Sequence, residues 1–160
     1  MKKIQTLENI VRIANTAHKA GKKIVTTNGC FDILHIGHIR NLKAAKRLGD
    51  ILIVGVNSDV SVRKNKGPKR PIISEKDRME ILAELNFVDY VFTFSTKRPY
   101  PWIMKIKPDI HVKGQGSEHS PAYKFERDVV IKSGGNVALV PNELGHSTTK
   151  IIEKIVKLYK

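Results

Sequence analysis

The feature that most restricts the fold of this chain is a regular alternation of short apolar runs with longer stretches of helical spacing. Such alternation is typical of a parallel sheet covered by helices, because parallel strands need long crossover connections. The apolar runs predict strands at residues 23–27, 51–56, 90–94, 109–112 and 137–140. The stretches around them predict helices at residues 7–20, 37–48, 75–86, 101–106, 121–133 and 148–158.

Glycine, proline and asparagine punctuate this pattern where helices should give way to strands, at residues 49–50, 107–109 and 134–136. A length of 160 residues suits one hydrophobic core. We therefore predict a single α/β domain over residues 1–160, with a Rossmann-like, doubly wound sheet of five parallel strands. Residues 65–71, which hold Gly67, Pro68 and Pro71, are expected to form one long basic loop.

The formal net charge of +14 attracts polyanions, but it does not distinguish nucleotides from nucleic acid or anionic membranes. A lysine-rich solvated surface without a function explains it equally well. Cys30 is the only cysteine, so no internal disulfide can form and a reducing compartment is permitted. No stretch resembles a signal peptide or a membrane span, so we expect a cytoplasmic protein without a membrane partner.

The segment from residue 26 to residue 38 follows the first strand and leads into a helix, at the sheet edge where open α/β folds bind ligands. His35 and His38 flank Gly37 at this helix start. The helix offers free N–H groups and a positive dipole end, Gly37 leaves room for a phosphate, and each imidazole can donate to phosphate oxygens. The dinucleotide and P-loop glycine motifs are both absent, which disfavours hydride transfer and P-loop hydrolysis.

His35 to His38, preceded by Gly29 to Asp32, resembles the His-x-Gly-His motif of the cytidylyltransferase-like nucleotidyltransferases. Residues 74–78 resemble the arginine-bearing helix start of that superfamily, and residues 146–152 resemble its Ser/Thr-rich final helix start. The resemblance covers a core of about residues 21–154, after an N-terminal helix. It implies transfer of a nucleoside monophosphate from a nucleoside triphosphate to a phosphorylated small molecule, with release of pyrophosphate.

Within the superfamily, the closest resemblance is to the adenylyltransferase domain that makes ADP-heptose from heptose 1-phosphate and ATP. It rests on residues 21–25, 27–32, 56–59, 70–72 and 112–114. It implies ATP and a sugar 1-phosphate as substrates, Mg²⁺ bound through triphosphate oxygens without a protein ligand, and a homodimer.

The chain departs from that family after Lys113 and Gly114, where residues 115–119 replace the usual Gly-Asp-Tyr and leave the exact sugar open. Residues 142–146 lack the arginine that precedes the final motif of glycerol-phosphate cytidylyltransferases, which argues against CTP.

Nucleotidyl transfer needs alignment and cationic stabilisation, because the acceptor phosphate oxygen is already ionised at neutral pH. On the resemblance, catalytic roles are expected for His35, His38, Lys66 and Arg78. Nucleotide binding is expected from Asn28, Gly29, Cys30, Phe31, Gly37, Lys113, Gly114, Ser147, Thr148 and Thr149. Substrate binding is expected from Asp32, Asn57, Asp59 and Arg70.

Several of these assignments have a structural alternative. Asp32 can hold a backbone amide or cap a turn, and Arg78 can form an ordinary surface salt bridge. Residues 147–149 can serve as a plain helix cap, and Lys66 shares its basic segment with Arg63 and Lys64.

Three other functions remain open from the sequence. The same chemistry could use CTP with a polyol or amino-alcohol phosphate, or FMN as the acceptor in FAD synthesis. A nucleic-acid-binding module is suggested by the net charge and by the basic residues 63–70, although no RNA-recognition pattern or zinc-ligand spacing supports it. A nucleotide sensor without turnover would keep the same pocket.

Overall fold

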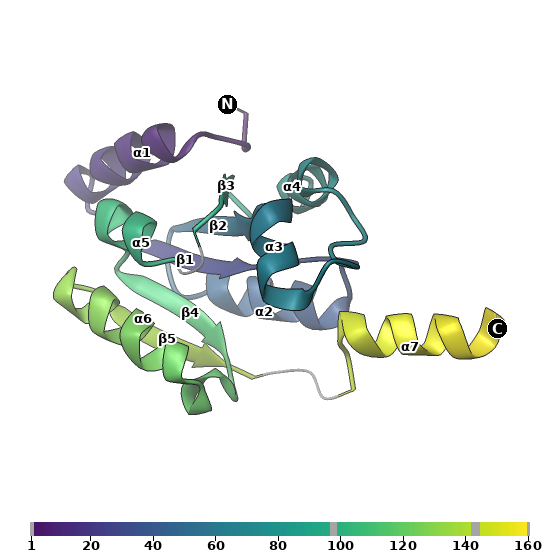
Figure 1. Ribbon diagram of the computed structural model, residues 1–160. Helices are drawn as coiled ribbons and strands as arrows, with labels where there is room; N and C mark the ends of the chain where they lie inside the picture. The colour runs from purple at the N-terminus through teal and green to yellow at the C-terminus, as the bar shows by residue number, and fades with distance from the viewer. Residues whose placement is uncertain (1, 97–98, 142–144, 160) are drawn as a thin grey trace.

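The computed structural model describes residues 2–96, 99–141 and 145–159. Its centre is an all-parallel sheet with helices on both faces, as Figure 1 shows. The strands follow the spatial order β3-β2-β1-β4-β5, which confirms the predicted doubly wound α/β fold. They are β1 (Ile24–Gly29), β2 (Ile51–Asn57), β3 (Tyr90–Phe94), β4 (Ile110–Gly114) and β5 (Asn136–Val140).

The helices begin mostly at serine or threonine residues whose side chains cap the first turn. Thr6 accepts a hydrogen bond from the Asn9 N–H at 3.2 Å, and Ser74 does the same for Asp77 at 3.2 Å. The helices are α1 (Leu7–Lys19), α2 (Ile36–Lys46), α3 (Asp59–Lys66), α4 (Glu75–Ala83), α5 (Tyr100–Ile106), α6 (Pro121–Lys132) and α7 (Thr148–Tyr159). A short 3₁₀ turn, η1 (Ser117–His119), precedes α6.

Two hydrophobic clusters hold the layers together, one on each face of the sheet. Leu42 of α2 and Leu82 of α4 pack on one face, and Ile10 of α1 and Trp102 of α5 pack on the other. Consecutive residues 52–54 of β2 are fully buried because both faces of this inner strand are covered. The continuous apolar runs that predicted the strands therefore reflect burial on both sides.

The site lies between β1 and β4, where the order of the strands in the sheet reverses direction. From β1 the chain moves outward through β2 to β3, and it then crosses back to β4, which pairs with β1 through Val25 and Ile110. At such a switch point the loops after the two adjacent strands separate and leave a crevice at their carboxyl ends. The loops after Gly29 and Gly114 border this crevice.

The predicted loop at residues 65–71 was wrong at its start, because α3 runs to Lys66 and ends at Gly67 with φ 95°. Ser58 caps this helix by accepting from the Ser61 N–H at 3.2 Å. The basic residues 63–66 occupy its last turn, where positive charge suits the helix dipole. The sequence pattern concealed this helix because its two apolar residues, Val60 and Val62, are spaced as in a strand.

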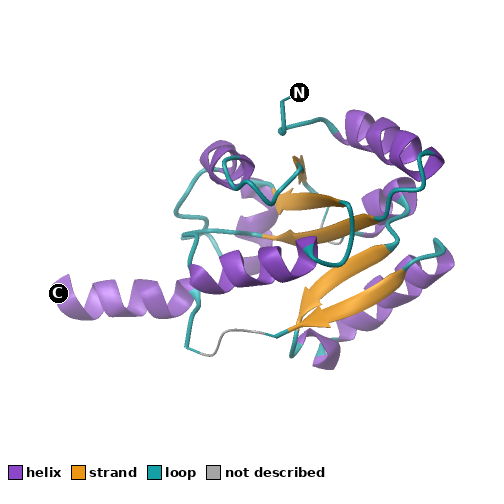
Figure 2. Ribbon diagram, turned by 180° about the vertical axis from the view of Figure 1, so that it is seen from behind, coloured by secondary structure: helices purple, strands orange, loops and turns teal. Residues whose placement is uncertain are grey.

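The final helix extends away from the sheet, as Figures 1 and 2 show. None of the described residues of α7 is buried, and Ile155, Val156 and Leu158 are exposed. Its first residue is nevertheless attached to the body of the protein, because the Thr148 hydroxyl donates to the backbone carbonyl of Asp32. The start of α7 therefore belongs to the site and the rest projects from it.

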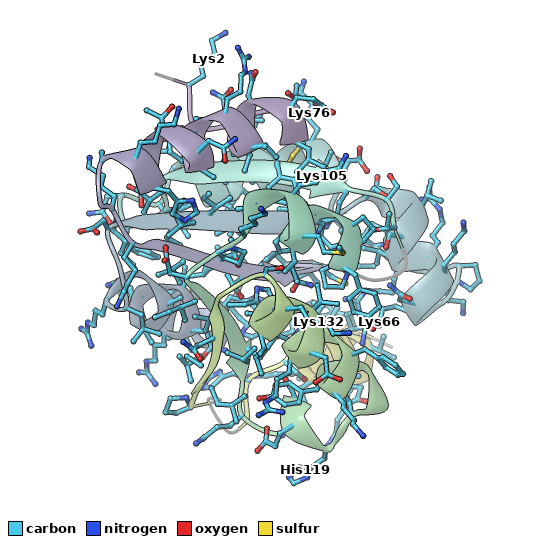
Figure 3. All side chains as sticks on the ribbon, turned by 90° about the vertical axis from the view of Figure 1, so that its left-hand side faces the viewer. Lys2, Lys66, Lys76, Lys105, His119 and Lys132 are labelled. Carbon is cyan, nitrogen blue, oxygen red and sulfur yellow. The ribbon has the colours of Figure 1, made fainter. Side chains whose placement is uncertain are left out.

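Cationic side chains project from many parts of the surface. The labelled Lys2, Lys76, Lys105 and Lys132 come from separate segments and lie at separate places in Figure 3. In the ranges that the structure covers, no helix combines the length and the apolar character needed to cross a bilayer.

Candidate functional site

A pocket of about 710 Å³ lies at the carboxyl ends of β1 and β4. Its wall combines the β1 to α2 loop, the end of α3 with the residues after it, the end of β4, and the start of α7. Fifteen of the residues predicted for the site line it: Asn28, Gly29, Cys30, Phe31, Asp32, His35, Gly37, His38, Lys66, Arg70, Lys113, Gly114, Ser147, Thr148 and Thr149.

The two histidines form a stacked pair at the start of α2. Their ring centroids lie 3.8 Å apart with an interplanar angle of 24°. The backbone N–H of His35 donates to Nδ1 of His38 at 3.4 Å, and Phe31 packs against the His38 ring at 5.3 Å between centroids. Because Nδ1 of His38 accepts this hydrogen bond, its proton is on Nε2 and is free to be donated to a ligand.

The surroundings of both imidazoles favour their neutral form. Burial, with a smaller effect of the neighbouring His35, lowers the pKa of His38 to about 4. Burial and the proximity of His146 also lower the pKa of His35. A triphosphate placed beside them would favour their charged form.

Asp32 connects three segments around the pocket. Its buried carboxylate accepts hydrogen bonds from the N–H groups of Ile72 at 3.0 Å and Ile73 at 2.9 Å, and it forms an ion pair with Arg70. Burial alone would raise the pKa of Asp32, but the two N–H groups and the guanidinium outweigh it and hold the pKa below its usual value. Asp32 thus holds backbone amides, as one of its two sequence interpretations proposed, and its carboxylate is occupied by protein groups.

The opposite wall is the start of α7. The Ser147 side chain accepts from the Lys150 N–H at 3.2 Å and so caps this helix. Residues 147–150 all line the pocket, where free N–H groups and hydroxyls of a helix start can bind phosphate. Two helix starts, those of α2 and α7, therefore contribute to one cavity, with Lys66 and Arg70 beside it.

The profile of the cytidylyltransferase-like family matches residues 26–154, a range that holds all of these elements. The chain belongs to this family. The assignment predicted from the three ordered motifs is thereby confirmed.

Curated relatives cover nearly the whole of this cytidylyltransferase-like chain. The bifunctional protein HldE of Syntrophotalea carbinolica is 44% identical over 158 residues, which are 99% of this chain and 32% of the relative. The protein of the same name from Nitratiruptor is 48% identical over 152 residues, which are 95% of this chain and 32% of the relative. The chain thus spans about a third of the length of these relatives.

Solved structures share the fold. A lipopolysaccharide core biosynthesis protein from Thermoplasma volcanium is 33% identical, with a TM-score of 0.64 over 77% of this chain and 98% of that one. The pantoate-beta-alanine ligase of Francisella tularensis, solved with beta-gamma ATP and beta-alanine, is 18% identical with a TM-score of 0.65. The match covers 93% of this chain and 69% of the ligase chain. At this low identity it is evidence for a shared fold and for nothing more.

Three of the predicted site residues of this family member lie outside the pocket lining: Arg78, Asn57 and Asp59. Arg78 is buried, and its guanidinium donates to the carbonyls of Ile73, at 2.9 Å, and of Cys30. It also forms an ion pair with Asp59 at 2.7 Å. These protein acceptors occupy the guanidinium that was expected to meet phosphate, so the structure makes Arg78 a brace behind the Cys30 loop.

Asn57 was expected to line the crevice because it ends a strand. Its side-chain amide instead donates to the Ser61 hydroxyl at 2.9 Å and is buried against α3. The difference arises because β2 is followed directly by α3, which covers the end of the strand.

Some lining residues were not predicted, among them Asn41, His146 and Lys150. Asn41 lies one helical turn after His38, so helical spacing from the histidine motif could have identified it. His146 and Lys150 lie within the final motif at residues 146–152, and only their neighbours were assigned a role.

The pocket residues do not form a metal site by themselves. In the ranges 2–96, 99–141 and 145–159, no cluster of at least three His, Cys, Asp or Glu side chains is arranged to hold a metal ion. The Asp32 carboxylate that lines the pocket is engaged by Arg70 and two backbone amides.

The lowered pKa of His38 predicts acid-sensitive stability. The folded chain remains unprotonated at His38 down to a pKa of about 4, whereas the unfolded chain takes up a proton near the ordinary value of 6.5. The stabilising contribution is thus complete above pH 6.5 and is lost as the pH falls toward 4. Melting temperatures measured between these pH values should fall, and His38→Gln should reduce the slope. An unchanged slope in the variant would contradict the assignment to His38.

Proposed function

We propose that this chain is a nucleotidyltransferase that transfers AMP from ATP to a sugar 1-phosphate, most specifically heptose 1-phosphate. The products are an ADP-sugar and pyrophosphate. The observation that carries the proposal is the pairing of two helix starts in one pocket, α2 with His35 and His38 and α7 with residues 147–149. Two sets of N–H groups directed to one cavity fit a triphosphate and a second phosphate better than they fit a single small anion.

The chemistry follows from these groups. A phosphate oxygen of the acceptor attacks the α-phosphorus of ATP, the bond from that phosphorus to the bridging oxygen breaks, and pyrophosphate leaves with the electron pair. The attacking oxygen is ionised, so no strong base is required. Nε2 of His38, together with His35 and Lys66, would donate to phosphate oxygens whose charge grows in the transition state. Arg70, held by Asp32, would bind a phosphate on the same side.

The choice of ATP and heptose phosphate rests on similarity. The relatives described above carry the name bifunctional protein HldE, and a structural relative is a lipopolysaccharide core biosynthesis protein. The motifs at residues 27–32 and 112–114 resemble the domain that makes ADP-heptose. These similarities favour the adenylyltransferase over the CTP-dependent and FAD-forming alternatives.

The nucleic-acid-binding alternative loses part of its support in the structure. It rested on the net charge and on the basic segment 63–70, and of that segment Lys66 and Arg70 line the pocket. Because ATP is a cytoplasmic metabolite, the proposal also implies a cytoplasmic enzyme. The homodimer remains an expectation from the family resemblance.

Pyrophosphate release by the purified chain tests the proposal. ATP and CTP are each combined, with Mg²⁺, with heptose 1-phosphate, glycerol 3-phosphate, an amino-alcohol phosphate and FMN. We expect release with ATP and heptose 1-phosphate at a rate at least tenfold above every other pair, a difference of about 1.4 kcal/mol in transition-state binding. Tight ATP binding without release from any pair would identify a nucleotide sensor instead.

A further inference from the structure

The β4 side of the pocket carries a buried ion pair for which the proposed phosphate chemistry has no use. Nζ of Lys113, near the end of β4, lies 2.7 Å from Oε2 of Glu126 on α6. The Glu126 side chain is 7% exposed and the Lys113 side chain is 17% exposed. Lys113 lines the pocket and Glu126 does not. The carboxylate therefore lies behind the pocket lining, and its charge restrains the side chain of Lys113.

The position of Glu126 follows from the fold. Figure 2 shows α6 packed behind β4 and β5, on the face of the sheet away from α2. Side chains alternate along a strand, so Lys113 points to the same face as the buried His111, whereas Val112 packs in the opposite cluster. Lys113 consequently meets α6, and Glu126 is the buried acidic residue of that helix.

The ion pair gives this wall a lower net positive charge than the phosphate-binding side of the pocket. A paired lysine and carboxylate carry almost no net charge, so they attract a phosphate weakly. The ammonium keeps N–H donors for a ligand, and its attraction to the carboxylate limits where the ammonium can lie. Ser117, four residues after Lys113 in the chain, also lines the pocket. His111, whose pKa is lowered by burial and then by Lys113, adds no positive charge beneath them. Neutral hydroxyl groups are the ligands that suit such a wall.

We propose that Glu126 is a positioning residue that makes Lys113 a recognition group for adjacent hydroxyls of a sugar ring. The inference rests on the proposed function, because the ribose of ATP and the sugar of the acceptor both present such hydroxyls. It assigns the β4 wall to ring hydroxyls and leaves phosphates to α2, α7 and Lys66. It also gives a role to residues on both sides of the segment 115–119, in which the sequence departs from the heptose enzymes.

The test compares kinetic constants of the wild-type chain and Glu126→Gln, with ATP and heptose 1-phosphate. Loss of the carboxylate leaves the lysine free to turn, so the KM of one substrate should rise about tenfold while kcat changes less than about threefold, as expected for a hydrogen bond to a charged group. Glu126→Asp should restore part of the lost affinity. Glu80→Gln, at an exposed position of α4, is the matched control and should change neither constant.

Deoxy analogues identify the hydroxyls. 2′-Deoxy-ATP and 3′-deoxy-ATP test the ribose, and heptose 1-phosphates lacking one ring hydroxyl test the acceptor. The wild-type chain should prefer one parent substrate over its deoxy analogue by about tenfold, and Glu126→Gln should lose most of that preference. An unaltered preference for every analogue, or a fall in kcat with unchanged KM values, would overturn the proposal.

Glu126→Gln could unfold the chain, because removing one partner of a buried ion pair is destabilising. A second variant keeps the proposal testable in that case. The double variant Lys113→Met/Glu126→Leu removes both charges, and apolar replacements of buried ion pairs usually fold. If circular dichroism shows Glu126→Gln unfolded, the double variant should show the same lost preference, and a retained preference would refute the proposal.

Failure of this inference can be distinguished from failure of the proposed function. If the wild-type chain releases no pyrophosphate with any sugar phosphate, the proposed function fails. Calorimetry then measures the affinities of the chain for a non-hydrolysable ATP analogue and for its 2′-deoxy form, which tests recognition of the ribose. A difference in affinity that Glu126→Gln abolishes would support recognition of ribose by Lys113, and equal affinities in the wild-type chain would refute it.

Discussion

Replacing His38 with alanine is expected to lower kcat for pyrophosphate release by about 10²–10³-fold, the usual cost of removing one preorganised donor from a developing anion. Nδ1 of His38 is fixed by the His35 N–H, so the opposite nitrogen is directed by the helix start itself. A donor held in this way needs little reorganisation during the reaction. Steady-state pyrophosphate release under saturating ATP and acceptor measures the effect.

The matched control is His119→Ala, because the side chain of His119 is 84% exposed on η1. It should leave kcat unchanged within experimental error. Far-ultraviolet circular dichroism of His38→Ala should match that of the wild-type chain, which separates lost chemistry from lost structure. A His38→Ala variant with kcat within threefold of wild type would remove this residue from the catalytic machinery.

Replacing Arg78 with leucine is expected to destabilise the fold by about 3 kcal/mol, in the range for breaking a buried ion pair. The change removes one guanidinium that contacts two backbone carbonyls and Asp59 at once, and it leaves those acceptors without their donor. For a chain of this size such a loss lowers the melting temperature by roughly 10 °C. Urea unfolding monitored by circular dichroism measures the change in free energy.

Arg63→Leu serves as the matched control, since Arg63 is an exposed arginine on α3. Its expected effect is within about 0.5 kcal/mol, as for other surface substitutions. If Arg78→Leu unfolds at the same urea concentration as wild type but binds ATP poorly, Arg78 acts on the ligand and the brace interpretation is wrong.

The sequence predicted the sheet well because the strands are defined by local composition. Residues 90–94 were predicted as the strand that the structure contains, and the other four strands differ by one or two residues at their ends. Burial on both faces makes the inner strand β2 a continuous apolar run, which is visible without tertiary information. Helix α3 was missed because its apolar residues, Val60 and Val62, are spaced as in a strand.

The pocket lining was predictable where the place of a residue follows from its position in a helix start. His35, Gly37 and residues 147–149 occupy helix starts, and a helix start is readable from sequence. The burial of Arg78 was not predictable, because it depends on Asp59 and on the carbonyl of Cys30, 48 residues earlier in the chain. The pairing of Glu126 with Lys113 was likewise not predictable, because only the packing of α6 against β4 brings the two side chains together.

The hydrogen bond from Thr148 to the Asp32 carbonyl joins residues 116 positions apart in the chain. One wall of the pocket is thus joined to the opposite wall by a tertiary hydrogen bond between the start of α7 and the loop after β1. Because no described residue of α7 is buried, the hydrophobic core does not depend on this helix. Detachment of α7 would therefore remove one wall of the pocket while the sheet and its covering helices stay folded.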